Sequence, residues 1–379
     1  MKKIGIVTVH NSPNYGACLQ AFALYEYIRQ CGADCEIIDV HRPVHEDYVY
    51  ERKYKSYRNN PFTLRKKARK VVAHLLGRSP ASEFYSPVAR QRFEDFNRQI
   101  KYSKAYNKLS ALEKDPPLYD VYISGSDQLW NPAQPYCLKP YFLTFAPRGS
   151  VKISYATSIG LTELSPKEKS DFRNYLETYS AISVRETQAK ELLDSFMDGK
   201  DVVRVSDPTF LLDVDYWKDI AVSPSVSGKY MAVFLLQRNE SLVNYALQLC
   251  KESGMKLVLL KNRDVARDGV LVDNDLGPKE FLGYLAGASM VLTDSFHCTV
   301  FSLLMGAENF YTYISPTSKR GSRIVDLLHT FSLENHLLPI DFSSSYATLA
   351  AQGIDRDFIL RIVNQEKKRS REFLDKWIR

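Results

Sequence analysis

The segment TDSFHCTVFSLLMG, residues 293–306, contains a histidine at the turn between a predicted strand and a predicted helix. The apolar run ASMVL precedes it, and apolar residues resume at helical spacing after it. Backbone N–H groups at a helix start attract anions, and the hydroxyls of Ser295 and Thr299 can add hydrogen bonds. Because histidine is the natural proton carrier near neutral pH, we predict that His297 transfers a proton rather than serving only a structural role.

Cys298 directly follows this histidine, so a nucleophilic Cys/His pair has to be considered. Adjacent residues on a helix point about 100° apart, which argues against direct activation of the thiol. The six cysteines of the chain include no CxxC pair, and no Cys/His set has the spacing of a zinc site. We therefore expect reduced cysteines, no metal and no cofactor.

Basic residues follow two other predicted strands. Arg185 ends the strand AISVR and is followed by Glu186. It can form an ordinary ion pair with Glu186, or it can bind a carboxylate or phosphate through two N–H groups. The segment YISPTSKRGSRIVDLL contains Lys319, Arg320 and Arg323 before a new helix. These residues form either a solvated basic turn or a second anion-binding site facing the first.

Two loops in the N-terminal half combine polar, aromatic and glycine residues after a predicted strand. The loop HNSPNYGACLQ lacks the GxGxxG of a dinucleotide site and the GK[ST] of a P-loop, and forms either a capped helix start or a substrate contact. In YISGSDQLWNP, a carboxylate, amides and an indole together suit a sugar. The alternatives are that Asp127 caps a helix and that Trp130 covers the core. The candidate contacts are Asn14, Tyr15, Gly16, Asp127, Gln128, Trp130 and Asn131.

The elements that must position these residues alternate along the chain as short apolar strands and amphipathic helices. This alternation predicts an α/β fold with parallel sheets covered by helices on both faces. The expected strands of the first half are Lys3–Val9, Cys35–Val40, Asp120–Gly125, Lys152–Thr157 and Ala181–Arg185. A second series begins with KYMAVFLL and continues with MKLVLLK and SMVLTD. Two doubly wound halves place a cleft beyond the carboxyl ends of their strands.

A chain of 379 residues is long enough for two domains. The segment VSDPTFLLDVDYW breaks the periodicity near residues 205–216 and marks a domain crossing. We predict a first Rossmann-like domain at 1–205, with a basic insertion at about 42–100, and a second at 206–355. The segment 356–379 carries apolar helical stripes, and we expect this helix to cross back to the first domain.

The net charge of +7 arises largely from residues 51–78. Within this segment Leu64, Ala68, Val71 and Leu75 form one helical stripe flanked by lysines and arginines. The pattern fits a surface helix against anionic lipid, and equally a solvated insertion packed on the first domain. We expect no nucleic-acid partner, because no RNA- or DNA-binding motif accompanies the charge. No apolar run approaches a membrane span, so we expect a cytoplasmic protein, with peripheral contact at the inner membrane face as the membrane option.

Several motifs taken together resemble one family. The segments GIVTVHNSPNYGACLQAFAL, YDVYISGSDQLWNP, ISYATSIG, ISVRE, DPTFLL, TDSFHCTVFSLLMG and SKRGSRIVDLL occur in the order found in polysaccharide pyruvyl transferases. Such a resemblance implies a GT-B-like fold, with two Rossmann-like doubly wound domains facing a central cleft. It also implies transfer of the pyruvyl group of phosphoenolpyruvate to sugar hydroxyls. The product is a ketal in capsule, exopolysaccharide or cell-wall polysaccharide.

By this resemblance His297 matches the active-site histidine of the family, and Arg185 and Lys319 or Arg320 match basic positions that hold phosphoenolpyruvate. Ser295 would add a hydrogen bond to the same substrate. The acceptor sugar, linked to a nucleotide, a lipid or a polymer, would lie on the loops around residues 14–16 and 127–131. One departure is Cys298, since many relatives carry glycine after the histidine. The basic segment 51–78 has no counterpart in the family pattern.

Two other functions are compatible with the same pattern. A GT-B glycosyltransferase that uses a nucleotide sugar would share the fold, because fold does not fix function. A non-catalytic protein that binds sugars or anions would use the same cleft and the same basic residues. The sequence does not indicate which oligomeric state the protein adopts.

Overall fold

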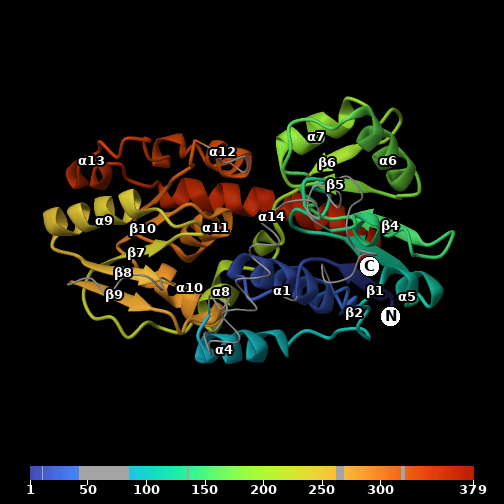
Figure 1. Ribbon diagram of the computed structural model, residues 1–379, viewed down its shortest axis with the longest axis horizontal. Coiled ribbons are helices and arrows are strands. Elements are labelled where there is room, and N and C mark those ends of the chain that lie inside the picture. Colours follow the sequence, from blue (N-terminus) through green and yellow to red (C-terminus); the bar gives the residue numbers. More distant parts are fainter. Residues whose placement is uncertain (11, 42–84, 135, 262–268, 317–320) are drawn as a thin grey trace, which may run out of the picture.

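The computed structural model describes residues 1–10, 12–41, 85–134, 136–261, 269–316 and 321–379. Two α/β units lie side by side, with the N-terminal strands in one and the C-terminal strands in the other (Figure 1). This arrangement confirms the predicted fold class. The basic segment 51–78, with its predicted amphipathic helix, and the candidate anion ligands Lys319 and Arg320 lie outside the described residues.

The strands of the first unit are all parallel. Their order is β2-β1-β3-β4, and β5 pairs with β6. An isolated parallel bridge between Ile153 and Ala181 joins β4 to the start of β5, so the two sheets continue one another. The strands described in this unit are β1 (Lys3–Val7), β2 (Asp34–Ile37), β3 (Val121–Ser124), β4 (Val151–Ser154), β5 (Ile182–Val184) and β6 (Val202–Arg204).

The second unit contains a parallel sheet in the order β11-β10-β7-β8-β9. Its strands are β7 (Tyr230–Phe234), β8 (Lys256–Leu260), β9 (Val270–Asp273), β10 (Met290–Thr293) and β11 (Phe310–Thr312). Each predicted strand is present, although most are shorter than expected. The sequence did not predict β6 and β9, because three or four residues between polar neighbours carry too little periodicity.

Helices cover the sheets of both units (Figure 1). Those of the first unit are α1 (Tyr15–Gln30), α4 (Pro87–Asn97), α5 (Leu109–Lys114), η2 (Lys139–Phe142), α6 (Pro166–Leu176) and α7 (Thr187–Asp194). After β6 the chain forms η3 (Pro208–Phe210) and α8 (Val214–Ile220), then α9 (Glu240–Ser253), α10 (Pro278–Gly287), α11 (Phe296–Met305), α12 (Ser322–Thr330), η4 (Glu334–His336) and α13 (Tyr346–Ala350).

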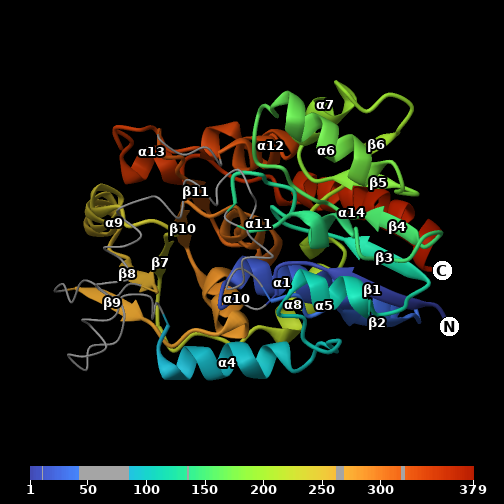
Figure 2. The ribbon, with the colours of Figure 1, turned by 45° about the vertical axis from the view of Figure 1, so that its right-hand side comes forward.

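The two units share one hydrophobic core. Helices α1, α10 and α11 meet between the units (Figure 2), and one cluster of buried side chains runs through all three. At the domain crossing the fully buried Trp217 donates from Nε1 to the carbonyl of Thr209 at 3.0 Å, and its ring packs edge-on against Phe301. The relative position of the units is therefore fixed by packing, which stabilises any site that both units build.

The last helix, α14 (Arg356–Ile378), lies across both units (Figure 1). Its Asp375 carboxylate accepts a hydrogen bond of 2.7 Å from the Tyr27 hydroxyl of α1. The backbone N–H of Ser206 donates to the hydroxyl of Ser370 at 2.9 Å. The last helix thus contacts the first unit at Tyr27 and Ser206. The domain limits at 205 and 355 stay predictions.

Two helices begin at the boundary between the units, and each has a side-chain cap. The Asn14 side chain accepts from the backbone N–H of Ala17 at the start of α1, and the Ser295 hydroxyl accepts from the N–H of Cys298 at the start of α11. Across the described residues, no helix combines the length and the apolar character needed to span a membrane.

Candidate active site

His297 lies in the first turn of α11, one turn beyond the end of β10. Its side chain is 10% exposed, and Nε2 lies 3.4 Å from Oδ2 of Asp207. The other side of the ring lies against Gly16 in the first turn of α1. Residues of both units thus hold the imidazole, and Nε2 is the nitrogen that faces a carboxylate.

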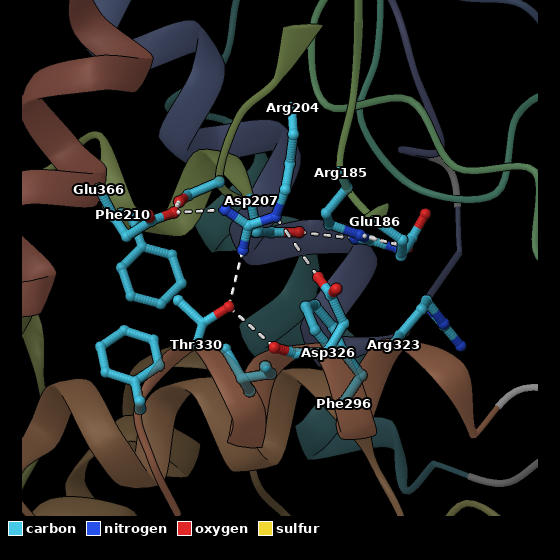
Figure 3. Close-up of a pocket in the computed structure, with 13 residues that line it drawn as sticks. Arg185, Glu186, Arg204, Asp207, Phe210, Phe296, Arg323, Asp326, Thr330 and Glu366 are labelled. Atoms are coloured by element: carbon cyan, nitrogen blue, oxygen red, sulfur yellow. Dashed lines mark hydrogen bonds and ion pairs between the residues drawn. The ribbon is translucent and has the colours of Figure 1, made fainter. Parts of the chain in front are cut away.

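Asp207 connects this histidine to an arginine. The same Oδ2 accepts a hydrogen bond of 2.6 Å from Nη1 of Arg185, while Oδ1 accepts from the backbone and hydroxyl of Thr209. The side chains of Asp207 and Arg185 are 0% and 3% exposed. Figure 3 shows Arg185 directed from the end of β5 toward Asp207, which follows β6. The sequence order of the strands therefore brings the two residues together at the carboxyl edge of the first sheet.

The electrostatics keep both groups charged. Burial by itself raises the pKa of Asp207, but the charges of His297 and Arg185 outweigh it and lower this pKa well below its ordinary value. Burial by itself lowers the pKa of Arg185, but the carboxylates of Glu186, Asp207 and Asp127 raise it. A fixed carboxylate thus bridges a fixed guanidinium and the imidazole.

The structure distinguishes the two interpretations of Arg185. Its Nε donates to Glu186 at 3.0 Å and its Nη1 donates to Asp207, so the ordinary ion pair is present. Its Nη2 is buried and has no hydrogen-bond partner within the described residues. Arg185 can therefore offer one nitrogen to a substrate anion, and not the two of a bidentate contact, while both carboxylates hold it.

A second group of charges lies beside the first. The backbone of Asp127 has a φ of 76°, in the left-handed region, and its carboxylate accepts from the N–H of Gln128 at 2.8 Å. Oδ1 of Asp127 lies 3.8 Å from Nη2 of Arg185 and 3.8 Å from Nη1 of Arg323. Burial by itself raises the pKa of Asp127, but the charges of Arg185, His297 and Arg323 lower it overall. This carboxylate is not a helix cap.

A pocket opens between these residues and α12, with about 330 Å³ of empty space including its mouth. Both units and α14 line it (Figure 3). His297 lies behind this lining, with Nε2 3.4 Å from Oδ2 of Asp207, which lines the pocket. Its wall includes Arg185, Arg204, Asp207, Phe296, Arg323 and Glu366. A pocket with several arginines and an aromatic side chain suits a small anionic ligand.

Two of the predicted sugar contacts are core residues instead. Trp130 is 0% exposed, stacks on Phe142 at 5.0 Å and donates from Nε1 to the carbonyl of Tyr141. Tyr15 is 2% exposed, stacks on Phe281 at 4.4 Å and donates to the carbonyl of Leu276. The prediction that these rings face a sugar is wrong for this arrangement, because no ring face is open to a ligand.

The other predicted acceptor residues lie at the boundary between the units or in the loop that follows β3. The side-chain oxygen of Asn14 caps α1, and that of Asn131 accepts from the N–H of Ala133. Nε2 of Gln128 is buried without a hydrogen-bond partner among the described residues, whereas Asp127 keeps part of its carboxylate exposed. The structure thus brings Asp127, Gly16, Arg185 and His297 together, while an acceptor role for these loops stays a prediction.

Ser295 and Cys298 have structural contacts that the sequence did not specify. Ser295 is 5% exposed, and its hydroxyl caps α11. Cys298 is completely buried, and burial raises the pKa of its thiol to about 12. A protonated, enclosed thiol cannot act as a nucleophile, which removes the Cys/His pair from consideration. No cysteine forms a disulfide in the described structure.

The sequence reasoning missed Asp207 as a site residue. The signal was the dipeptide DP in SDPTFLL, which we interpreted as a domain crossing. Asp207 belongs both to the domain crossing and to the site, since it caps η3 and follows β6. Over the described ranges, no group of three or more His, Cys, Asp or Glu side chains is arranged to hold a metal ion.

Solved structures similar to this chain share its fold. The UDP-N-acetylglucosamine 2-epimerase of Rickettsia bellii matches with a TM-score of 0.53 and 10% identity, covering 99% of this chain and 95% of the epimerase. UGT89C1 of Arabidopsis thaliana, complexed with quercetin, matches with a TM-score of 0.51 and 11% identity over 100% and 99% of the two chains. The calicheamicin glycosyltransferase CalG4 has a TM-score of 0.50 and 12% identity over 100% and 98%. These similarities show a GT-B fold.

Sequence comparison identifies the family. No curated protein matches the chain. The family model described as polysaccharide pyruvyl transferase matches residues 14–315, a range that contains the Arg185, Asp207 and His297 cluster. With its GT-B fold and this match over most of its length, the chain belongs to the polysaccharide pyruvyl transferase family.

Proposed function

We propose that this protein transfers the pyruvyl group of phosphoenolpyruvate to two hydroxyls of a sugar and forms a ketal. The polysaccharide would belong to a capsule, an exopolysaccharide or a cell wall. The observation that supports this most is the buried contact of Asp207 with both His297 and Arg185, at the boundary between two Rossmann-like units. It joins a proton carrier to a fixed charge pair beside a pocket lined by arginines.

The donor carries a carboxylate and a phosphate, so its site has to supply several fixed cations. Arg185 offers Nη2, and Arg323 lies across Asp127 from it. Lys319 and Arg320, four and three residues before Arg323 in the sequence, are further candidates for the phosphate. Arg185, Arg204 and Arg323 all line the pocket, so a ligand there would lie beside several cations.

The first chemical step needs an acid. A proton goes to C3 of phosphoenolpyruvate, the C2=C3 electron pair forms the new C–H bond, and C2 becomes electron-deficient. We assign this proton to His297, whose Nε2 is the ring nitrogen on the side of the pocket-lining Asp207, since Nδ1 lies against Gly16. Asp207, with Oδ2 3.4 Å from Nε2, would orient the ring.

Two additions complete the transfer. One sugar hydroxyl forms a bond to C2 and its proton returns to the neutral imidazole, and the C2–O bond to phosphate then breaks with its electron pair on phosphate. The second hydroxyl adds to C2 and its proton goes to the released phosphate, which closes the ketal. The cations of Arg185 and its neighbours stabilise the phosphate as charge moves onto it. Asp127, at the exposed edge of the site, is the described carboxylate best placed to contact the acceptor hydroxyls.

One contact in the second unit argues against a nucleotide-sugar donor. The strand order places the topological switch between β7 and β10, where such folds bind diphosphates. There the carboxylate of Asp294 accepts from the backbone N–H groups of Leu236 and Gln237, at 2.6 and 3.1 Å. An acidic side chain on these donors opposes the binding of a diphosphate.

Phosphate release tests the proposal. The protein is incubated with phosphoenolpyruvate and a panel of free, nucleotide-linked and lipid-linked sugars, and new ketals are identified by mass and NMR. We expect acceptor-dependent release, and a decrease of about 100-fold or more in His297→Ala, as for loss of a general acid. The matched control is His329→Ala, because His329 is 81% exposed on the outer side of α12.

Two outcomes would contradict the proposal. An H297A protein that transfers pyruvate at the wild-type rate would remove His297 from the mechanism. Thermal protection by a nucleotide sugar, with none by phosphoenolpyruvate, would instead support a glycosyltransferase.

Peripheral contact with the inner membrane face is part of the proposal for a lipid-linked acceptor. It rests on the basic sequence of residues 51–78. Liposome sedimentation with and without anionic lipid tests it, and equal sedimentation in the two would contradict it.

A further inference from the structure

We propose that Arg185 and Arg323 form a paired-guanidinium site for an anionic group, and that Asp127 is the counter-ion which this group displaces. The identification of the anion as the carboxylate or phosphate of phosphoenolpyruvate rests on the proposed function. Asp127 is equally distant from the two arginines. Oδ1 of Asp127 lies 3.8 Å from a terminal nitrogen of each arginine, although the two come from different units.

The two guanidinium groups share one aromatic platform. The central carbon of Arg185 lies 4.6 Å from the ring centroid of Phe296, and that of Arg323 lies 5.5 Å from it. A ring attracts cations through its negative face and gives them no hydrogen bonds. Phe296 therefore lies close to both cations without taking a hydrogen bond from Nη2 of Arg185 or Nη1 of Arg323, the two nitrogens that face Asp127.

Asp127 differs from the other carboxylates around Arg185 in the described structure. Glu186 and Asp207 have side chains 5% and 0% exposed and contact the guanidinium at 3.0 and 2.6 Å. The Asp127 side chain is 21% exposed, and 3.8 Å exceeds the length of a direct hydrogen bond. Of the three carboxylates, Asp127 therefore has the longest contact with Arg185 and the most access to solvent, so it is the one that an incoming anion would replace.

The position of Arg323 is set by the helix that carries it. Residues 323, 326 and 330 lie on one face of α12, which lines the pocket. Arg204, at the end of β6, donates to the hydroxyl of Thr330 at 2.8 Å and lies 3.5 Å from the carboxylate of Asp326 (Figure 3). It also donates to Glu366 of α14 at 3.1 Å. The first unit thus fixes α12, and Arg323 is 11% exposed instead of extending into solvent.

The charges then predict an unusual response to mutation. Removal of a residue that binds substrate weakens binding, but removal of a competing counter-ion strengthens it. Asp127→Asn is a conservative change, because asparagine tolerates the left-handed backbone and its oxygen can still accept from Gln128. Its expected effect is tighter anion binding.

The experiment is calorimetric titration of the folded protein with phosphoenolpyruvate and, separately, with inorganic phosphate and pyruvate. We expect Asp127→Asn to bind phosphoenolpyruvate about three- to tenfold more tightly at low salt, and less so at high salt. Arg323→Gln should bind it about tenfold or more weakly, and Arg323→Lys should lie between, since it keeps the charge and loses the planar fork. Asp95→Asn and Arg98→Gln are matched controls, because this ion pair lies exposed on α4.

Equal or weaker binding by D127N would overturn the displacement, and unchanged binding by R323Q would overturn the site. Melting temperatures show whether each variant is folded. Should the wild type bind phosphate as tightly as phosphoenolpyruvate and release none in the transfer assay, the proposed function fails. The response of phosphate binding to D127N and R323Q then still decides the anion site.

Discussion

The imidazole of His297 occupies the space into which a side chain at position 16 would extend. A Cβ added to Gly16 would lie 2.2 Å from Nδ1 of His297 and 2.5 Å from Cγ. The two residues belong to different units, at the first turns of α1 and α11. The orientation of the proposed catalytic histidine therefore depends on the docking of one unit against the other.

Gly16→Ala should lower kcat for phosphate release by about tenfold or more, because the added methyl displaces the ring and small misplacements of a catalytic group are costly. The α-helix itself should tolerate the change, since alanine is the better helix former by about 1 kcal/mol. Steady-state kinetics and a melting curve measure both effects.

The control for this variant is Gly353→Ala. Position 353 is exposed, and an added Cβ meets no atom within 4 Å. It should match the wild type in both measurements. Wild-type kcat in G16A would show that the ring has room to move, and that the close contact has no role in catalysis.

Asp207→Asn should lower activity by about 100-fold and should also change how stability depends on pH. Burial raises the pKa of Asp207, but His297 and Arg185 lower it more, so folding favours the ionised form. The unfolded chain then binds the proton first as the pH falls, and the stability that this charge contributes above about pH 4 is lost on acidification. Denaturant titrations of the two proteins between pH 7 and pH 3 measure this.

The free energy of unfolding of D207N should therefore decrease less steeply with acidification than that of the wild type. Parallel decreases would mean that the charge of Asp207 contributes no net stability. Wild-type turnover by D207N would remove it as the group that orients His297.

Trp130→Phe should destabilise the fold and leave the KM for the acceptor unchanged. The change removes the hydrogen bond from Nε1 to the carbonyl of Tyr141 and leaves a cavity beside Phe142. We expect a loss of about 1–3 kcal/mol in the free energy of unfolding. A raised KM with unchanged stability would restore the sugar-stacking role that the sequence suggested.

Cys298→Ala should keep kcat within about threefold of the wild type, because a buried thiol whose pKa is raised to about 12 stays protonated at neutral pH. Peptide mapping after alkylation of the native protein should find Cys298 unmodified. A loss of activity in a folded C298A, or rapid alkylation, would contradict the view that this residue only fills space under α11.

Part of the site could be predicted without the structure because it depends on local order. A strand followed by a helix places the next residues at the carboxyl edge of a sheet, whichever other strands surround it. Arg185 after β5 and His297 after β10 both follow this rule. The alternation of strands and helices predicted the two parallel sheets for the same reason, since periodicity is a property of neighbouring residues.

Other features depend on which segments meet in space. The sequence shows an indole and a phenol in polar loops, but Trp130 and Tyr15 are buried by Phe142 and Phe281, residues 12 and 266 positions away. The sequence did not predict the short strand β6 or the role of Asp207 after it. The partners of the strand and of the carboxylate, β5, Arg185 and His297, lie elsewhere in the chain.

The sequence by itself determined the family, the α/β class and the histidine and arginine proposed to act on the donor. The tertiary structure decided that Asp207 joins these two residues, that Gly16 has to lack a side chain, and that Arg323 faces Arg185 across Asp127. The physical reason is that residue type and spacing fix what a side chain can do. Which charged group lies 3 or 4 Å from that side chain depends on how the two units, which are far apart in the sequence, pack against each other.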